Sequence, residues 1–302
     1  MVVLSDQAQG VSAGEWCPFG TWGAGPELPG DQAPDDARSV CFDSDVLAER
    51  LEILGAPVVR LATPPEAWPG LVVVRLCDVW PDGRATRVSY VVRHANAPGD
   101  PGPVDGVLEL RLDDTGYAFL SGHRMRVAIS TTSWPMVWPE ATPAGFPFLV
   151  GVSTLELPVR PLRLEDGALP DLGEPWRPVR AADVLEPATA DRTVAERPDG
   201  TLEVCNRIDS GRTRVRSTGI VVHAGADDTA TIRESDPLSA RMESVRMVTL
   251  EHPGGPAVSV TGTLALTATA VTWSLTGRLV ATQDGVVIAD RTIDRTIPRR
   301  IP

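Results

Sequence analysis

Apolar and polar residues alternate along much of the chain, and the alternation is clearest in the run 122–139. Met125, Val127 and Ile129 fall on one side of this run, whereas arginine, alanine and serine occupy the intervening positions. A period of two is typical of a half-buried β-strand, and Gly122 marks the turn before it. We therefore predict that this run contains the central strand of a β-sandwich.

The second half of the same run cannot extend a sheet. Pro135 and Pro139 lack the N–H group that a ladder of strands requires, so the strand has to end in a stiff loop. Trp134 and Trp138 lie in that loop. Exposed aromatic side chains mark ligand or partner surfaces, but both side chains could equally pack into the end of their own domain. The sequence leaves these alternatives open.

Short alternating segments separated by Gly, Pro and Asp fill most of the remaining chain. This pattern predicts an all-β protein made of sandwiches or barrels, with one brief helical turn at 46–51. The expected strands of the first half lie at 51–61, 71–79, 86–93, 107–112 and 149–160. Those of the second half lie at 201–207, 212–223, 229–234, 242–251, 257–268, 269–282 and 286–297.

The spacing of these segments indicates two domains, which agrees with a prior of about 150 residues per domain. We expect an irregular lead segment at 1–38, a first β domain at 39–165, a Pro-rich linker at 166–182 and a second antiparallel β domain at 183–302. The lead segment holds Trp16, Phe19 and Trp22 without any periodicity. These aromatic side chains should pack on the following domain or on protein that precedes Met1.

Composition limits the classes of partner. The formal net charge of −12 argues against nucleic acid and anionic membranes, which require a basic surface. No apolar run approaches the roughly 20 residues that span a bilayer, and the N-terminus does not resemble a signal peptide. The four cysteines are far apart and form no C-x-x-C pair, so we expect free thiols, a cytoplasmic protein and neither a metal site nor a cofactor.

Three residue patterns are candidates for catalytic or metal-binding sites. Residues 10–14 read G-x-S-x-G, but Ser12 is flanked by neither the apolar strand nor the helix that a nucleophile elbow needs. His123 opens the central strand without an evident carboxylate partner, so a turn residue is a better interpretation than a catalytic base. The acidic pairs 35–36, 113–114 and 227–228 do not alternate as calcium ligands do, and we expect them to form turns.

Several runs, taken in order, resemble the C-terminal part of the cocaine esterase/NonD family of serine hydrolases, which is related to X-Pro dipeptidyl peptidases. They are Gly14-Glu15-Trp16-Cys17, Asp31-Gln32, Asp35-Asp36, Leu51 to Pro57, Arg75 to Val79, Pro81-Asp82-Gly83, Gly122-His123-Arg124, Ala128-Ile129-Ser130, Trp134-Pro135 and Trp138-Pro139. Asp236 to Ala240 and Thr296 to Arg299 resemble the tail of longer members. Each run is short, but their order and spacing make the match specific.

The resemblance implies a jelly-roll β-sandwich of the galactose-binding-like type, followed by the second antiparallel β domain. In that family the sandwich packs against an α/β-hydrolase domain that carries the Ser-Asp-His triad. Because this sequence begins after the position of the family's catalytic histidine, no triad residue can be assigned here. The implied partner is a hydrolase domain, in the same protein or in a separate chain.

Three hypotheses follow from these patterns. The first is a non-catalytic wall of a hydrolase active site, with Trp16, Phe19, Trp22, Trp134 and Trp138 facing substrate or partner; a homo-oligomer is compatible with it. The second is a free-standing sandwich that binds a ligand or carbohydrate. The third, ranked last, is a small hydrolase that uses Ser12. Whether this chain is itself an enzyme is therefore left open by the sequence.

We expect a fluorophosphonate probe to leave this chain unlabelled, because Ser12 lacks the surroundings that activate a nucleophilic serine. In-gel fluorescence and peptide mass spectrometry would detect labelling. Labelling at Ser12 that disappears in the Ser12→Ala variant would contradict the first two hypotheses and support the third.

Overall fold

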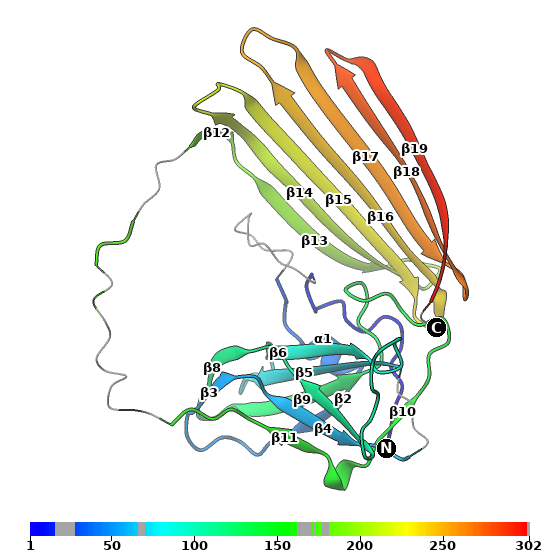
Figure 1. The fold of residues 1–302 in the computed structure, drawn as a ribbon. Coiled ribbons are helices and arrows are strands. Elements are labelled where there is room, and N and C mark those ends of the chain that lie inside the picture. The colour runs from blue at the N-terminus through cyan, green and yellow to red at the C-terminus, as the bar shows by residue number, and fades with distance from the viewer. Residues whose placement is uncertain are drawn as a thin grey trace. The chain divides into compact units, whose positions relative to one another are not determined.

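Antiparallel strands form nearly all of the regular structure in the computed structural model, which describes residues 1–15, 28–65, 70–161, 163, 171, 173–176 and 181–300. The predicted all-β class is therefore confirmed. The chain divides into two compact units, with the division between residues 166 and 167. Each unit is described separately below (Figure 1).

A four-stranded antiparallel sheet forms one layer of the first unit. Its strands follow the order β2-β9-β5-β6, so the predicted central strand β9 lies inside the sheet, between β2 and β5. The bounds are β2 (Val40–Asp43), β5 (Leu71–Val79), β6 (Ala85–His94) and β9 (Arg124–Ser130).

Three smaller sheets complete the unit. Strand β4 pairs with β7 and β11, β3 pairs with β8, and β1 pairs with β10. Their bounds are β1 (Val2–Val3), β3 (Leu51–Gly55), β4 (Val58–Ala62), β7 (Val107–Arg111), β8 (Thr115–Phe119), β10 (Phe146–Pro147) and β11 (Thr154–Glu156). One apolar core joins these strands to the four-stranded sheet, with Val74 and Ile129 from the sheet clustered with Leu61, Leu108 and Phe119.

Strand β5 is buried along its whole length, which is unusual for an antiparallel sheet because one face is commonly solvated. Val72, Val74 and Leu76 point into the sandwich core. Arg75 and Cys77 belong to the opposite face by the period of two, and both are also buried. Something other than the second layer of the sandwich must therefore cover this outer face.

The second unit contains one antiparallel sheet in the order β12-β14-β15-β16-β17-β18-β19, with β13 also paired to β14 (Figure 1). From β13 to β19, each strand pairs with the next along the chain. The bounds are β12 (Ala182–Glu186), β13 (Thr189–Glu196), β14 (Thr201–Val215), β15 (Val221–Arg233), β16 (Asp236–Glu251), β17 (Ala257–Ala268), β18 (Thr272–Gln283) and β19 (Val286–Pro298).

The two faces of this sheet differ in chemistry. Directly opposed residues in an antiparallel ladder share a face, so the register assigns every side chain. The apolar face is carried mainly by Val194, Val204, Ile208, Ala230, Ile232, Met242, Val248, Leu250, Val260, Leu264, Leu266, Leu275, Leu279, Ile293 and Ile297. The polar face is rich in threonine, aspartate, glutamate and arginine, as at Glu203, Thr229, Thr263 and Thr276.

The structure corrects several predicted elements. Residues 46–51 form no helical turn, and the α-helix observed is α1 (Ala33–Asp36) in the predicted lead segment. The predicted strand 149–160 is a 3₁₀ turn, η1 (Val150–Val152), followed by the short β11. Local pattern could not anticipate these differences, because tertiary contacts override propensity in short segments.

Two further strands differ from the prediction. Asp113 and Asp114 lie in the connection after β7, but the sequence did not predict β8, which begins immediately after them at Thr115. The predicted strand 212–223 spans a real turn, because β14 ends at Val215 and β15 begins at Val221. No helix among the described residues is long and apolar enough to cross a membrane.

Candidate functional site

Residues 5–15 and 28–38 of the predicted lead segment cover the outer face of the four-stranded sheet. Residues 5–15 adopt turns and coil, yet Gln7, Gln9 and Ala13 are buried. Backbone hydrogen bonds tie this segment to the loop after β9, including one from the Trp134 amide to the Gln9 carbonyl at 2.8 Å. The residues up to 15 therefore pack on the domain that follows, whereas the expectation for Trp16, Phe19 and Trp22 concerns residues outside those that the structure describes.

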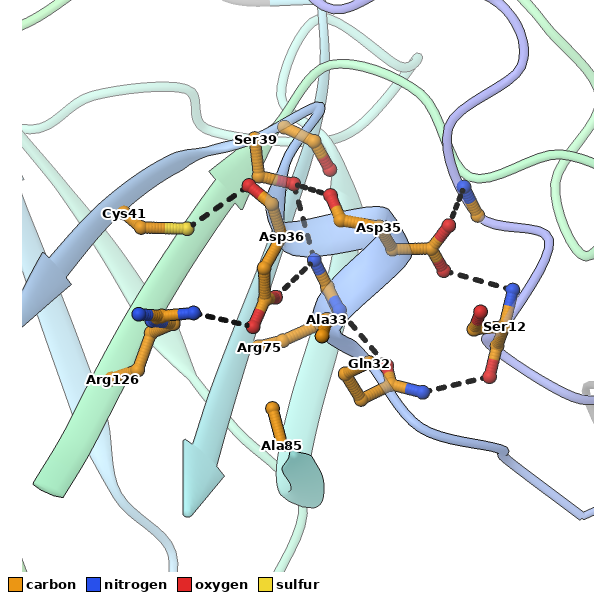
Figure 2. A network of polar contacts seen from close by, with 12 residues as sticks. Ser12, Gln32, Ala33, Asp35, Asp36, Ser39, Cys41, Arg75, Ala85 and Arg126 are labelled. Atoms are coloured by element: carbon orange, nitrogen blue, oxygen red, sulfur yellow. Dashed lines mark hydrogen bonds and ion pairs between the residues drawn. The ribbon is translucent and has the colours of Figure 1, made fainter. Parts of the chain in front are cut away.

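A buried ion-pair network connects this segment to the sheet (Figure 2). Arg75 extends from the middle of β5, and its Nη2 lies 2.8 Å from Asp36 Oδ1, while its Nη1 donates to Gln32 Oε1 at 2.9 Å. Arg126 of β9 approaches the other oxygen of Asp36 at 3.0 Å. The Arg75 and Asp36 side chains are each only 3% exposed, so they form a desolvated pair rather than a surface ion pair.

Arg126 carries this network to the domain surface. Its Nε and Nη2 donate to the two carboxylate oxygens of Asp43, each at 2.7 Å. This bidentate hydrogen bonding lowers the pKa of Asp43 and raises that of Arg126. Asp36 thus lies between two arginines, of which one is buried and the other is held in place by a second carboxylate.

Asp35 holds the backbone of the lead segment. Its two oxygens accept hydrogen bonds from the amides of Gly10 at 3.1 Å and Ser12 at 2.9 Å. Burial raises the pKa of Asp35, against the opposing effects of Arg75 and these two amides. Gln32 Nε2 donates to the Ser12 carbonyl at 2.7 Å (Figure 2). The backbone at Ser12 is therefore bound both through its amide and through its carbonyl.

Gly10 allows the close approach that this arrangement needs. Its φ is +111°, and a Cβ built on it would lie 2.5 Å from the carbonyl carbon of Ser133. Any side chain at this position would therefore collide with backbone. The close approach to Ser133 thus explains why the first position of the G-x-S-x-G run is a glycine. This explanation does not require Ser12 to be a nucleophile.

Ser12 itself has no catalytic surroundings. It lies in a turn, and residues 13–15 after it form no helix. Among the described residues, no serine hydroxyl lies within hydrogen-bonding distance of a histidine ring; the partners of His94, His123 and His223 are Glu140, Asp78 and Asp209.

His123 does have the carboxylate partner that its sequence surroundings did not reveal. Its Nδ1 lies 2.9 Å from Asp78 Oδ1, and Asp78 Oδ2 also accepts a hydrogen bond from the Tyr117 hydroxyl at 2.9 Å. Burial and the hydrogen bond to Asp78 raise the pKa of Tyr117. The indole of Trp80 packs over the imidazole with ring centroids 5.3 Å apart. These contacts join β5, β8 and the start of β9, which is a structural role.

The half-buried thiol of Cys41 and the buried thiol of Cys77 are poor nucleophiles. Desolvation raises the pKa of Cys41 to about 11 and that of Cys77 to about 12, so neither is ionised appreciably near neutral pH. Cys41, Cys77 and Cys205 are all free thiols.

The tryptophan candidates divide into two groups. Trp134 is 1% exposed and meets the half-buried Trp138 edge-on, with ring centroids 5.4 Å apart. Trp134 therefore packs within its own domain, the alternative that its sequence left open. Trp16, Phe19 and Trp22 lie outside the described residues, and a surface role for them and for Trp138 stays a prediction.

One apolar cavity of about 170 Å³ lies in the sandwich, lined by Phe42, Val59, Leu61, Ile129 and Phe148 among others. Ser153 and Thr154 supply its few polar groups. A sugar site needs convergent polar side chains, so this cavity does not support the carbohydrate-binding alternative.

The sequence interpretation missed the main polar residues of this domain. Asp35 and Asp36 were expected only to form a turn, but both are buried and bonded to other segments. A signal was present, because Arg75 and Asp78 interrupt the otherwise apolar strand Leu71–Val79. A charge inside a strand buried on both faces requires a buried partner, although the sequence alone does not say which one.

The fold and this network define a β-sandwich domain whose buried charged residues connect the segment before β2 to the four-stranded sheet. Residues 4–149 match the family model of the X-Pro dipeptidyl-peptidase C-terminal non-catalytic domain. The resemblance identified from the sequence is thereby confirmed for the first unit; the sheet of the second unit lies outside the matched residues.

The chain is also similar to individual proteins over part of its length. The cocaine esterase of Rhodococcus sp. (strain MB1 Bresler) is 29% identical over 120 residues, which cover 35% of this chain and 21% of the esterase. An aminopeptidase structure from a marine sediment archaeon (Thaumarchaeota archaeon) is 28% identical, with 37% of this chain and 21% of that chain covered and a TM-score of 0.32. An alpha-amino acid ester hydrolase structure is 23% identical, with 53% and 32% covered and a TM-score of 0.40. The match thus spans about a fifth of the length of the esterase.

The buried ion pair should be important for stability. We expect Arg75→Met to lower the free energy of unfolding by about 3 kcal/mol, because Asp36 would lose its buried partner and keep only Arg126. Urea denaturation followed by circular dichroism measures this loss. Arg60→Met is the matched control, since Arg60 pairs with Glu109 and Glu156 at the surface and should change stability little. Equal effects of both substitutions would contradict the assigned role of Arg75.

The thiols provide an independent test of the packing. With a pKa of about 11, roughly one Cys41 thiol in a thousand is ionised at pH 8, so iodoacetamide should modify it very slowly in the native protein. Cys77 should be slower still, and both should react readily in denaturant. Peptide mass spectrometry gives the rates. Rapid native modification of Cys77 would show that the outer face of the sheet is open.

Proposed function

We propose that the first unit is the C-terminal β module of an α/β serine hydrolase and that it packs on a catalytic domain and helps to wall its active site. The match of residues 4–149 to a non-catalytic domain of this enzyme class is the observation that carries the proposal. The catalytic domain belongs to the same protein or to a separate chain. The substrate is an ester or a peptide bond, as the names of the similar proteins indicate.

The packing of the lead segment supports this role. In a module that walls an active site, the chain near the interface has to be held in one position, because small displacements of a binding wall are costly for catalysis. Asp35 binds two backbone amides of this segment, and the Arg75–Asp36 pair holds Asp35 and its helix on the sheet. The network therefore gives the module a rigid edge beside the residues proposed to meet the partner.

The proposed contact surface includes Trp16, Phe19, Trp22 and Trp138. Aromatic side chains are enriched at protein interfaces because they bury a large area with little loss of conformational entropy. Trp138 lies beside Trp134, whose amide is bonded to the lead segment, so one end of the sandwich combines both features. The free thiols of Cys41, Cys77 and Cys205 are consistent with a cytoplasmic enzyme.

The reading frame immediately upstream of the Met1 codon is the first place to look for the catalytic domain. We expect it to encode an α/β-hydrolase that forms a one-to-one complex with this chain. The complex should hydrolyse a p-nitrophenyl ester, whereas this chain alone should not. Size-exclusion chromatography with light scattering and steady-state kinetics test both points.

Single substitutions test which residues of this chain help to line the active site of the complex. Trp138→Ala should raise the KM of the complex several-fold, whereas Trp176→Ala, at a side chain that is 84% exposed, should leave it unchanged. Three results would contradict the proposal: a hydrolase that is fully active and does not bind this chain, ester turnover by this chain alone that Ser12→Ala abolishes, or no hydrolase frame together with no complex.

A further inference from the structure

The sheet of the second unit has an apolar face that is too large to remain in water. Seven consecutive strands of about 12 residues, spaced about 4.8 Å apart with a rise of about 3.3 Å per residue, present roughly 1,300 Å² on one face. The largest apolar patch of an ordinary monomer is only about 300–600 Å². On this face Val248, Leu264 and Leu279 are 41%, 40% and 41% exposed, whereas Val204, Ala230 and Ile232 of β14 and β15 are already buried within the chain.

The composition of the two faces shows that this exposure is not an ordinary solvated surface. An antiparallel sheet with one wet side alternates apolar and polar residues, and the apolar side is covered in the folded protein. Here Leu264 and Leu279 alternate with Thr263 and Arg278 along the same strands. The polar face is thus suited to water, and the apolar face is suited to a second layer about 10 Å away.

The polar groups inside the apolar face bind one another. Arg246 forms a bidentate ion pair with Asp228, with distances of 2.8 and 2.7 Å, and Arg192 donates to the neutral amide of Asn206 at 2.8 Å. Both pairs lie on the apolar face by the strand register. A covering layer would therefore meet an ion pair and a hydrogen-bonded arginine near the middle of strands β13 to β16.

Charged side chains lie at both edges of this face. Strand β13 carries Glu196 and also Arg192, which is hydrogen-bonded to Asn206, and β19 at the other edge carries Arg291 and Arg295. Neither Arg291 nor Arg295 has a carboxylate partner among the residues that the structure describes. A surface with complementary edges can match a copy of itself, because a twofold axis running along the strands places each β19 over the β13 of the other copy.

The positions along the strands agree with that symmetry. Through the successive ladders, Arg295 lies level with Leu275, Met242, Val204 and Val194. Glu196 is two residues beyond Val194 on the same face, a displacement of about 7 Å, which an arginine side chain can reach. The same contact would occur twice in the symmetric pair.

We propose that a second copy of this chain covers the apolar face, so that the sheets of two protomers form a β-sandwich across a twofold axis. The face of roughly 1,300 Å² per protomer, less the small part over the buried Val204, Ala230 and Ile232, still exceeds the roughly 800 Å² that each partner contributes to a standard stable interface. The contact is independent of the hydrolase partner proposed above, because it involves only the second unit.

Sedimentation of the full-length chain at micromolar concentrations tests this proposal. The wild-type chain should sediment as a dimer, at twice the chain mass of 32.2 kDa. Leu264→Lys should give a monomer, because each dimer would bury two unpaired charges. Thr263→Lys is the matched control on the polar face of the same strand and should remain dimeric. A monomeric wild type, or a Leu264→Lys variant that is as dimeric as the wild type, would overturn the proposal.

Charge exchange tests the symmetry without touching the apolar centre. Glu196→Arg or Arg295→Glu alone should weaken the dimer roughly fivefold, as expected for an exposed ion pair that occurs twice. The double variant should recover the wild-type dissociation constant. If the far-ultraviolet circular dichroism spectrum shows that Leu264→Lys does not fold, these edge substitutions still test whether the dimer forms through this face. Failure of the double variant to recover affinity would overturn the arrangement.

Discussion

The first unit depends on the burial of one strand from both sides. Strand β5 packs its even-numbered apolar residues into the sandwich and turns Arg75 toward the lead segment. A guanidinium in that position cannot remain unpaired, since removing a charge from water costs several kcal/mol unless a partner and hydrogen bonds replace the water. Asp36 and Gln32 supply them, and both come from the segment that covers the sheet. The covering segment and the charge beneath it therefore require each other.

This coupling explains why an irregular segment can be an integral part of the domain. Residues 5–15 have no regular structure and little apolar periodicity, so they contribute few core contacts of their own. Their order comes from hydrogen bonds to Asp35 and from backbone contacts with the loop after β9. The second unit shows the opposite situation, because its regular sheet has an apolar face whose exposure calls for a partner. In the first unit the buried Arg75 and Asp36 are paired within the chain, whereas in the second unit large apolar side chains of the sheet stay exposed.

The distribution of acidic and histidine residues carries a related lesson about function. Asp78, His123 and Tyr117 form a connected group, and Asp35 and Asp36 lie in a second one. Both resemble catalytic clusters in composition, yet their oxygens and nitrogens are directed at arginines, amides and ring nitrogens of the domain itself. Buried polar networks of this kind specify how elements pack, a role that is compatible with the non-catalytic family matched by residues 4–149.

The sequence by itself determined the β class, the strand at Arg124–Ser130 and the resemblance to a known family, because alternation with a period of two and the order of short motifs are local properties. Tertiary structure alone decided which charges meet. Asp36 and Arg75 are far apart in the chain, and nothing near Asp36 distinguishes a buried ion pair from a surface turn. It also decided that Trp134 is buried and that Thr115 begins a strand, since burial and strand pairing depend on segments that approach only in the folded chain.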